Sequence, residues 1–200
     1  MMKAILFDCD GVIVKRDKYF SQRMKIDFGI ELNDTPEPSF FKNEFIDCEL
    51  GKKDLKVELE KQIPKWGIDW SVDQVLKYWF EGERELDERM VKKIEDLRSQ
   101  GVKCYLSTNN EKYRTEYLRD AAGLGKILDG IFSCCYLGYM KPDIKFWAEI
   151  HKALPEINKA EVLVIDNKKE MADSAAAFGF HAEFFSTYEN FIEQLKKYNL

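Results

Sequence analysis

The sequence predicts an α/β protein whose core is a parallel β-sheet covered by helices on both faces. Short apolar runs alternate along the chain with longer charged segments that have helical periodicity. This alternation is typical of a parallel sheet whose strands are joined by crossover helices. One long segment, residues 15–82, breaks the alternation and is expected to form a helical insert. The predicted architecture is therefore a Rossmann-like, doubly wound parallel sheet with a small all-helical domain.

Five apolar runs are predicted to form the strands of this sheet. Each run is short and is largely apolar on consecutive residues, a pattern that favours strands buried on both faces over strands with one solvated face. The runs are residues 3–7, 102–106, 130–132, 162–165 and 181–185.

Helices are predicted in the charged segments between these runs. Glycines stand where several of the helices would end, and glycine is common there because it adopts the left-handed conformation that closes a helix. The glycines are Gly101, Gly123 and Gly179. The predicted helices are residues 83–100, 112–122, 143–154, 170–178 and 188–198.

The insert contains no convincing buried strand, only amphipathic stretches rich in aromatic residues. Turn-like interruptions occur at Asn33–Pro38 and Pro64–Gly67. We expect most of the aromatic residues to form the insert's own core and its contact with the sheet domain, and one or two to face a substrate. They include Phe40, Phe41, Phe45, Trp66, Trp70, Tyr78, Trp79 and Phe80. The predicted domains are residues 1–14 with 83–200 for the sheet domain, and residues 15–82 for the insert.

The composition restricts the class of protein. A hydrophobic share of 45% and a charged share of 34% fit an ordinary globular domain. The formal net charge of -5 argues against nucleic acid as a partner. No apolar stretch is long enough for a membrane span or a signal peptide, so no membrane association is expected. The five cysteines lack metal-binding spacing, which indicates reduced thiols in a cytoplasmic protein. The oligomeric state stays open.

Two carboxylates follow the first predicted strand. In an extended chain, Asp8 and Asp10 point to the same side. One of them can attack a substrate or bind a metal while the other exchanges a proton. Gly11 then allows a sharp turn that presents backbone N–H groups to an anion. Aspartate and glycine are also ordinary turn residues, so this motif alone is a modest signal.

Other polar residues follow later strands. Thr108 and Asn109 come after the second strand, with Ser107 as a competing register, and they are suited to binding phosphate oxygens. Lys141 precedes a proline, and Asp166 follows the fourth strand. Because the carboxyl ends of parallel strands meet at one edge of a sheet, we expect these groups to lie together. Such a set can bind a divalent cation and a phosphate dianion.

On these residues the sequence resembles the haloacid dehalogenase superfamily, in the phosphatase-like branch that carries a helical cap after the first strand. The family's DxDG motif stands at residues 8–11. Its Ser/Thr motif looks like Thr108-Asn109, its lysine motif like Lys141-Pro142, and its acidic motif begins at Asp166. The resemblance covers nearly the whole chain.

The resemblance implies a magnesium-dependent phosphatase acting on a small phosphorylated metabolite. Asp8 would attack phosphorus and form an aspartyl-phosphate, and Asp10 would act as general acid and base. The substrate-binding residues would be Gly11, Thr108, Asn109 and Lys141. The Mg²⁺ ligands would be Asp8, the backbone carbonyl of Asp10, and Asp166.

The acidic motif departs from the family's usual pattern. Related phosphatases often have a second Asp followed later by an Asn, whereas this chain has Asn167 and Met171 at those positions. Glu170 lies at a spacing that other members use for their second acid. Asn167 and Glu170 are therefore further candidates for metal ligands, and metal affinity is the property that the departure affects most.

Two other functions are compatible with the same motifs. A sugar phosphomutase would use Asp8 and Asp10 to pass the phosphate to a sugar hydroxyl. A catalytically weakened member would bind a phospholigand or a protein partner, and the residues that favour this alternative are Asn167 and Met171. Asp10 favours phosphate chemistry over dehalogenation, because the dehalogenases of this family lack the second Asp.

Overall fold

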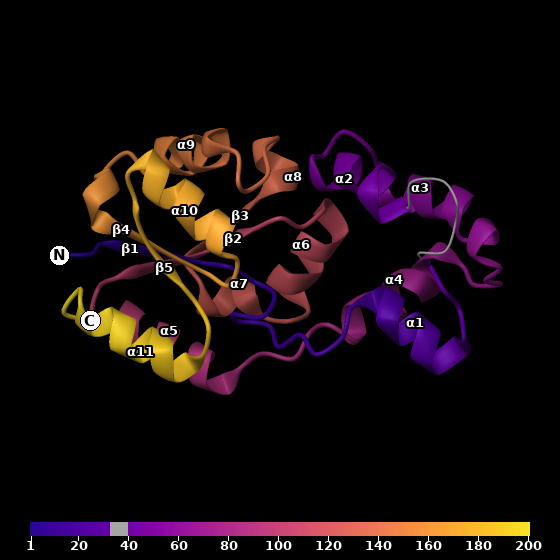
Figure 1. The fold of residues 1–200 in the computed structure, drawn as a ribbon, viewed down its shortest axis with the longest axis horizontal. Coiled ribbons are helices and arrows are strands. Elements are labelled where there is room, and N and C mark those ends of the chain that lie inside the picture. Colours follow the sequence, from indigo (N-terminus) through magenta and orange to yellow (C-terminus); the bar gives the residue numbers. More distant parts are fainter. Residues whose placement is uncertain (33–39) are drawn as a thin grey trace.

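The computed structural model describes residues 1–32 and 40–200 and contains a five-stranded sheet in which every strand is parallel to its neighbours. The strand order is β3-β2-β1-β4-β5 (Figure 1). The strands are β1 (Ala4–Phe7), β2 (Lys103–Thr108), β3 (Gly130–Ser133), β4 (Val162–Asp166) and β5 (His181–Phe184). The predicted parallel α/β sheet is confirmed.

Helices cover both faces of this sheet. Figure 1 shows α9 (Ile144–Ala153) and α10 (Lys169–Phe178) on one side of the strands, and α5 (Glu88–Ser99) and α11 (Tyr188–Lys196) on the other. The remaining helices of the sheet domain are α6 (Lys112–Asp120), α7 (Leu124–Ile127) and the short α8 (Cys134–Leu137). Both faces are therefore buried, which explains the consecutive apolar residues of the strands.

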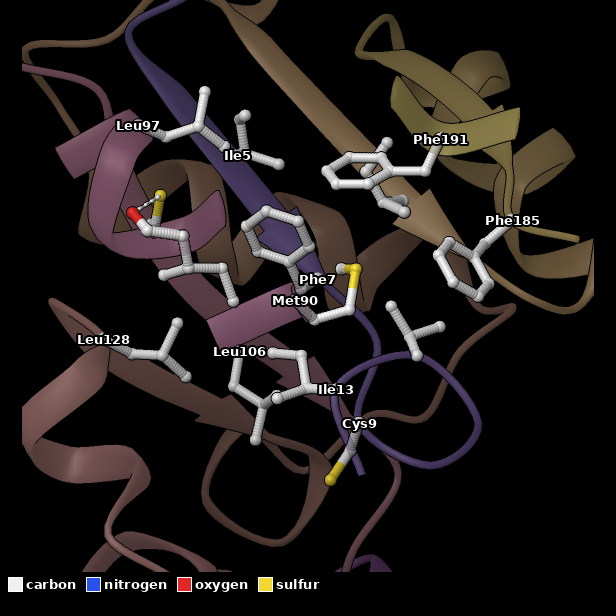
Figure 2. Close-up of a cluster of buried hydrophobic side chains, with 14 of the residues drawn as sticks. Ile5, Phe7, Cys9, Ile13, Met90, Leu97, Leu106, Leu128, Phe185 and Phe191 are labelled. Atoms are coloured by element: carbon white, nitrogen blue, oxygen red, sulfur yellow. Dashed lines mark hydrogen bonds between the residues drawn. The ribbon is translucent and has the colours of Figure 1, made fainter. Parts of the chain in front are cut away.

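The alternation of side chains along β1 determines where its acidic residues point. Ile5, Phe7 and Cys9 belong to one buried cluster, in which the rings of Phe7 and Phe191 are 5.9 Å apart (Figure 2). Ala4 and Leu6 belong to the cluster on the opposite face. Cys9 continues the first set, so Asp8 points to the opposite side of the chain, just beyond the last residue of β1.

Residues 15–82, between β1 and α5, contain helices and no strand where they are described, as expected. They comprise α1 (Phe20–Phe28), η1 (Phe40–Lys42), α2 (Glu44–Glu49), α3 (Leu55–Gln62), η2 (Pro64–Trp66) and α4 (Val72–Glu81). These helices share a hydrophobic cluster of their own and lie beyond the end of the sheet at which β1 ends (Figure 1). The predicted turn at Pro64–Gly67 is the 3-10 helix η2 with Gly67 as its cap, whereas the predicted turn at Asn33–Pro38 lies outside the described residues.

Two linkers join this helical segment to the sheet domain, and they pair with each other. Val14 and Leu86 form an antiparallel bridge, and the N–H of Lys15 donates to the carbonyl of Glu85 at 2.7 Å. The helix predicted over 83–100 therefore begins later, at Glu88, with the side chain of Asp87 as its cap.

Across the residues that the structure describes, no helix has the length and apolar character needed to cross a membrane.

Candidate active site

The ends of three strands and one loop place four polar side chains around a single cavity of about 670 Å³. Asp8 follows β1, Thr108 ends β2 and Asp166 ends β4. Lys141 comes from the loop between α8 and α9. All four line the cavity together with Asp10, Gly11, Asn109 and Asn167. The topology thus brings together residues that lie far apart in the sequence.

The ammonium group of Lys141 lies at the centre of this arrangement. Its Nζ donates to Asp8 at 2.8 Å, to the carbonyl of Ser107 at 2.9 Å and to Asp166 at 2.6 Å. Burial by itself lowers the pKa of Lys141, but the charges of the two carboxylates and the hydrogen bonds to them raise it to about 12. The lysine is therefore a permanent cation.

Asn109 fixes the backbone of the loop that carries this lysine. Its Nδ2 donates to the carbonyl of Lys141 at 2.9 Å, and its Oδ1 accepts from the N–H of Lys141 at 2.9 Å. Both ends of the amide are used in this way. Asn109 also lines the cavity, so its role in substrate binding stays a prediction beside this structural role in the lysine loop.

The carboxylate of Asp8 is mostly enclosed, with 13% of its side chain exposed. Burial raises the pKa of Asp8, and the charge of Lys141 opposes that rise. Asp8 and Asp166 are two carboxyl groups that share one ammonium, so when both are ionised only one of the two charges is neutralised. This part of the cavity then has an excess of negative charge, which favours the binding of a cation.

The structure selects between the two registers predicted after the second strand. Thr108 lines the cavity, and its Oγ1 accepts from Nδ2 of Asn110 at 2.7 Å. The Ser107 hydroxyl instead lies 3.4 Å from the carbonyl of Phe7 and is fully buried. Thr108 is thus the hydroxyl available to a ligand.

A group of buried charges surrounds Asp10, and sequence reasoning missed it. Guanidinium groups of Arg16 and Arg114 contact the two oxygens of the Asp10 carboxylate, the latter at 3.5 Å. Glu83, which is 4% exposed, lies 4.0 Å from Arg16, and its backbone carbonyl accepts from Arg114. In the sequence these residues look like solvated charges of a linker and a helix, and no local signal marks them as buried.

Gly11 and Asn167 are in direct contact. Gly11 has a φ of +82°, and a Cβ at that position would lie 2.3 Å from Nδ2 of Asn167. The same Nδ2 donates to the backbone carbonyl of Asp10 at 3.0 Å. Oδ1 of Asn167 is buried and has no hydrogen-bond partner. A buried oxygen without a partner is costly unless a cation or water satisfies it.

The donor set around this oxygen fits a magnesium ion. Asp8, the Asp10 carbonyl and Asn167 supply oxygen ligands only, which is what Mg²⁺ prefers. Asp166 adds two further oxygens, which accept from Lys141 and from the N–H of Lys168 at 2.9 Å. Each of them keeps a second lone pair, as Asp8 and the Asp10 carbonyl do, so Asp166 remains a candidate ligand. Within residues 1–32 and 40–200, no three His, Cys, Asp or Glu side chains are close enough together to hold a metal by themselves. Backbone and amide oxygens would have to complete the site.

The remaining predicted candidate, Glu170, is exposed on α10 and does not line the cavity, although Met171 does. Within the described residues the cavity thus receives no second acid from this helix. The position next to Asp166 carries a neutral amide instead.

Comparison with known proteins agrees with this geometry. The family model for haloacid dehalogenase-like hydrolases matches residues 2–179. A sesquiterpene phosphatase of Aspergillus oryzae is 32% identical over 93 residues, which are 46% of this chain and 47% of that protein. The chain thus matches about half the length of this curated relative.

Several solved structures share the fold. A haloacid dehalogenase family enzyme of Bacteroides thetaiotaomicron, crystallised as an Asp-to-Ala mutant with magnesium and inorganic phosphate, has a TM-score of 0.78 at 14% identity, with 96% of this chain and 99% of that chain covered. A predicted hydrolase of the same family from Porphyromonas gingivalis has a TM-score of 0.76 at 22% identity, covering 99% and 98%. The L-2-haloacid dehalogenase of Xanthobacter autotrophicus has a TM-score of 0.65 at 15% identity, covering 98% and 83%.

Proposed function

The chain belongs to the haloacid dehalogenase-like hydrolase family, and we propose that it is a magnesium-dependent phosphatase that hydrolyses a small phosphorylated metabolite through an aspartyl-phosphate on Asp8. The observation that carries this proposal is the position of Asp8 in the cavity, beside the cation of Lys141 and two residues before Asp10. The phosphatase name of the Aspergillus relative supports it. The magnesium and phosphate in the Bacteroides structure are consistent with it.

In the proposed reaction a carboxylate oxygen of Asp8 attacks phosphorus, and the bond between phosphorus and the ester oxygen breaks. Asp10 gives a proton to the departing oxygen, which leaves as an alcohol. A water molecule then attacks the phosphorus of the aspartyl-phosphate and passes a proton to Asp10. Inorganic phosphate leaves and Asp8 is restored, so the sum is phosphate ester plus water to alcohol plus phosphate.

The other residues of the cavity are proposed to neutralise charge or to position the reacting groups. Lys141 is placed to neutralise negative charge on Asp8 and on the phosphoryl group, and Thr108 is placed to donate its hydroxyl to a phosphoryl oxygen. Arg16 and Arg114 hold the Asp10 carboxylate in the cavity. Magnesium, when bound, would supply additional positive charge to the phosphoryl oxygens. Its proposed ligands are Asp8, the Asp10 carbonyl and Asn167, with Asp166 retained as a further candidate.

We also propose that residues 15–82 act as a cap that selects the substrate, with residues 1–14 and 83–200 as the catalytic domain. The proposal is supported by the separate hydrophobic cluster of the helical segment and by its contribution to the lining of the cavity. The paired linkers at Val14 and Leu86 are the natural boundary between the two parts.

Hydrolysis of p-nitrophenyl phosphate, measured with magnesium and with EDTA, tests the proposed function. We expect turnover with magnesium and its loss in EDTA. Release of inorganic phosphate from sugar, nucleotide and alkyl phosphates is measured in parallel, because p-nitrophenyl phosphate is a small substrate. Absence of phosphate release from all of these esters would contradict the proposal, and formation of an isomeric sugar phosphate would identify a phosphomutase instead.

Substitution of Asp10 by Asn is expected to slow hydrolysis of alkyl phosphates far more than that of p-nitrophenyl phosphate. An alkoxide is a poor leaving group and needs a proton, whereas p-nitrophenolate leaves without one. General acid catalysis is typically worth about 10²–10⁴ in rate, and we expect a loss in that range for octyl phosphate. Single-turnover measurements of the first step compare the two esters. Equal losses for both would contradict a role for Asp10 as the acid.

Substitution of Asn167 by Asp is expected to strengthen magnesium binding by about tenfold or more, because a carboxylate replaces a neutral amide among the proposed ligands. The same change adds a negative charge at a buried position next to the Asp10 carbonyl, so the metal-free protein should become less stable. Thermal unfolding with and without magnesium, together with calorimetric titration, measures both effects. Asn167→Ala is the matched control, for which weaker binding is expected. An unchanged magnesium affinity in Asn167→Asp would exclude this residue as a ligand.

A further inference from the structure

The cavity that contains Asp8 is also lined by four aromatic rings from the helical segment. They are Phe20 of α1, Phe41 of η1, Phe45 of α2 and Trp79 of α4, and we refer to these four as the aromatic wall. The exposed ring of Tyr19 also reaches the cavity but is not counted in the wall. Phe20 and Trp79 are almost fully buried, and Phe41 and Phe45 are half-buried. The wall gives the cavity a large apolar surface close to a site built for an anion.

The rings of the aromatic wall hold one another in place. Trp79 stacks on Phe20 with ring centroids 4.7 Å apart and an interplanar angle of 15°. Phe45 and Phe41 also pack against Trp79, at 5.3 Å and 5.9 Å. Because each ring is fixed by its neighbours, a ligand that packs against the wall need not order it first, which favours binding.

The polar residues that the helical segment adds to the lining do not suit a second phosphate. Asp17 and Tyr19 are exposed, and Asp17 would repel an anion. The one such residue within the wall is Glu49, and burial raises its pKa to about 8 against the opposing charge of Lys168. At neutral pH this carboxyl is largely protonated, so it adds no charge to the apolar surface.

The two arginines that line the cavity already have acidic or carbonyl partners. Arg16 contacts Asp10 and lies 4.0 Å from Glu83, and Arg114 contacts Asp10 and the Glu83 carbonyl. A substrate with a second phosphate would have to displace these carboxylate partners. Lys168 and Ser21 also line the cavity, the first as an exposed lysine of the sheet domain. The apolar surface that residues 15–82 offer to the organic part of a substrate is mainly the aromatic wall.

We propose that the substrate is a phosphate monoester of an apolar alcohol, whose hydrocarbon part packs against the aromatic wall while its phosphate lies in the cavity next to Asp8 and Lys141. The inference rests on the proposed phosphatase function and adds the chemical class of the substrate. A cavity of about 670 Å³ is within the range that encloses a ligand of drug size.

A series of straight-chain alkylphosphonates from methyl to octyl, titrated calorimetrically in the presence of magnesium, tests the inference without requiring turnover. Burial of each additional methylene should tighten binding by about fourfold until the cavity is full. The corresponding alkyl phosphates are assayed for phosphate release, and kcat/KM should rise in the same way. Glucose 6-phosphate and fructose 1,6-bisphosphate should be poor substrates compared with octyl phosphate.

Substitution of Phe45 by Ala should flatten the dependence on chain length, since it removes one ring of the wall. Phe28→Ala is the matched control, because Phe28 also packs against aromatic rings of the helical segment, at 4.9 Å from Trp70, but does not line the cavity. It should leave the dependence unchanged. Phe45→Leu keeps an apolar side chain and should retain most of the dependence, so it reports on the wall if Phe45→Ala fails to fold.

The possible results separate the two proposals. A dissociation constant that does not change with chain length, or a preference for the sugar phosphates, would overturn the apolar substrate class even if the protein proves to be a phosphatase. Tight binding of long alkylphosphonates with no hydrolysis of any alkyl phosphate would support the binding surface and contradict the phosphatase function.

Discussion

Replacing Asp8 by Asn should lower turnover of every phosphate monoester by about 10⁴-fold or more, because it removes the proposed nucleophile. The amide is nearly the same size as the carboxylate, so the residues around it keep their positions. The backbone N–H of Asp8 still donates to the carbonyl of Ile165 at 2.9 Å, and Lys141 still pairs with Asp166 at 2.6 Å. We therefore expect the fold to be unchanged.

Stability should distinguish loss of chemistry from loss of structure in this variant. Burial raises the pKa of Asp8, which means that the enclosed carboxylate carries a desolvation cost in the folded protein. Asn removes that charge, so the midpoint of thermal unfolding in EDTA should be equal to or above that of the wild type. Asp17→Asn, which changes an exposed acid at the same cavity, is the matched control and should keep its activity. Near-normal magnesium-dependent turnover of Asp8→Asn would exclude Asp8 as the nucleophile.

The sheet could be predicted from the sequence because its signals are local. The runs of the central strands β1 and β4 are apolar over consecutive residues, which is typical of strands buried on both faces. The runs of the edge strands β3 and β5 are shorter or more polar, and those strands are less buried. The parallel order then follows from the helices between them, and it brings the residues after the strands to one edge. For this reason the sequence alone predicts that Asp8, Thr108, Lys141 and Asp166 lie together, and all four line one cavity.

The features that could not be predicted depend on contacts between distant segments. Residues 83–86 were assigned to a helix, but Leu86 pairs with Val14, and Glu83 is enclosed by arginines of other segments. Nothing in the local sequence distinguishes such a buried glutamate from a solvated one. The same holds for Arg114, which lies on a helix with many charges and is nonetheless 3% exposed.

The different roles of adjacent or similar residues could not be predicted from the sequence either. Asp166 and Asn167 are adjacent, and charge alone favours the aspartate as a metal ligand. In the structure Asp166 accepts a hydrogen bond at each oxygen and Oδ1 of Asn167 has no partner, so Asn167 joins Asp166 as a candidate ligand. Likewise, the aromatic residues of the helical segment look alike in the sequence, but Trp79, Phe41 and Phe45 line the cavity whereas Trp66 and Trp70 do not.

Replacing Lys141 by Met should damage both stability and activity, because this lysine is the shared cation of two enclosed carboxylates. With 3% of its side chain exposed, Lys141 is buried beside Asp8 and Asp166. Removing one partner of a buried ion pair leaves uncompensated charge, and such changes typically cost about 3–5 kcal/mol. We expect a loss of that size in the free energy of unfolding, measured with urea in EDTA. The control is Lys145→Met, at an exposed lysine of α9. It should change the free energy of unfolding by less than about 0.5 kcal/mol.

The activity of Lys141→Met should fall further than its stability explains. Loss of one fixed positive charge at a transferring phosphoryl group typically costs about 10²–10³ in rate. The same substitution removes the charge that holds down the pKa of Asp8, so a smaller fraction of Asp8 is ionised and able to attack. Assays at a temperature where unfolding curves show the variant fully folded separate this effect from destabilisation. Turnover within tenfold of the wild type under those conditions would mean that Lys141 only balances charge in the fold, and that the phosphoryl group is neutralised by other residues of the cavity.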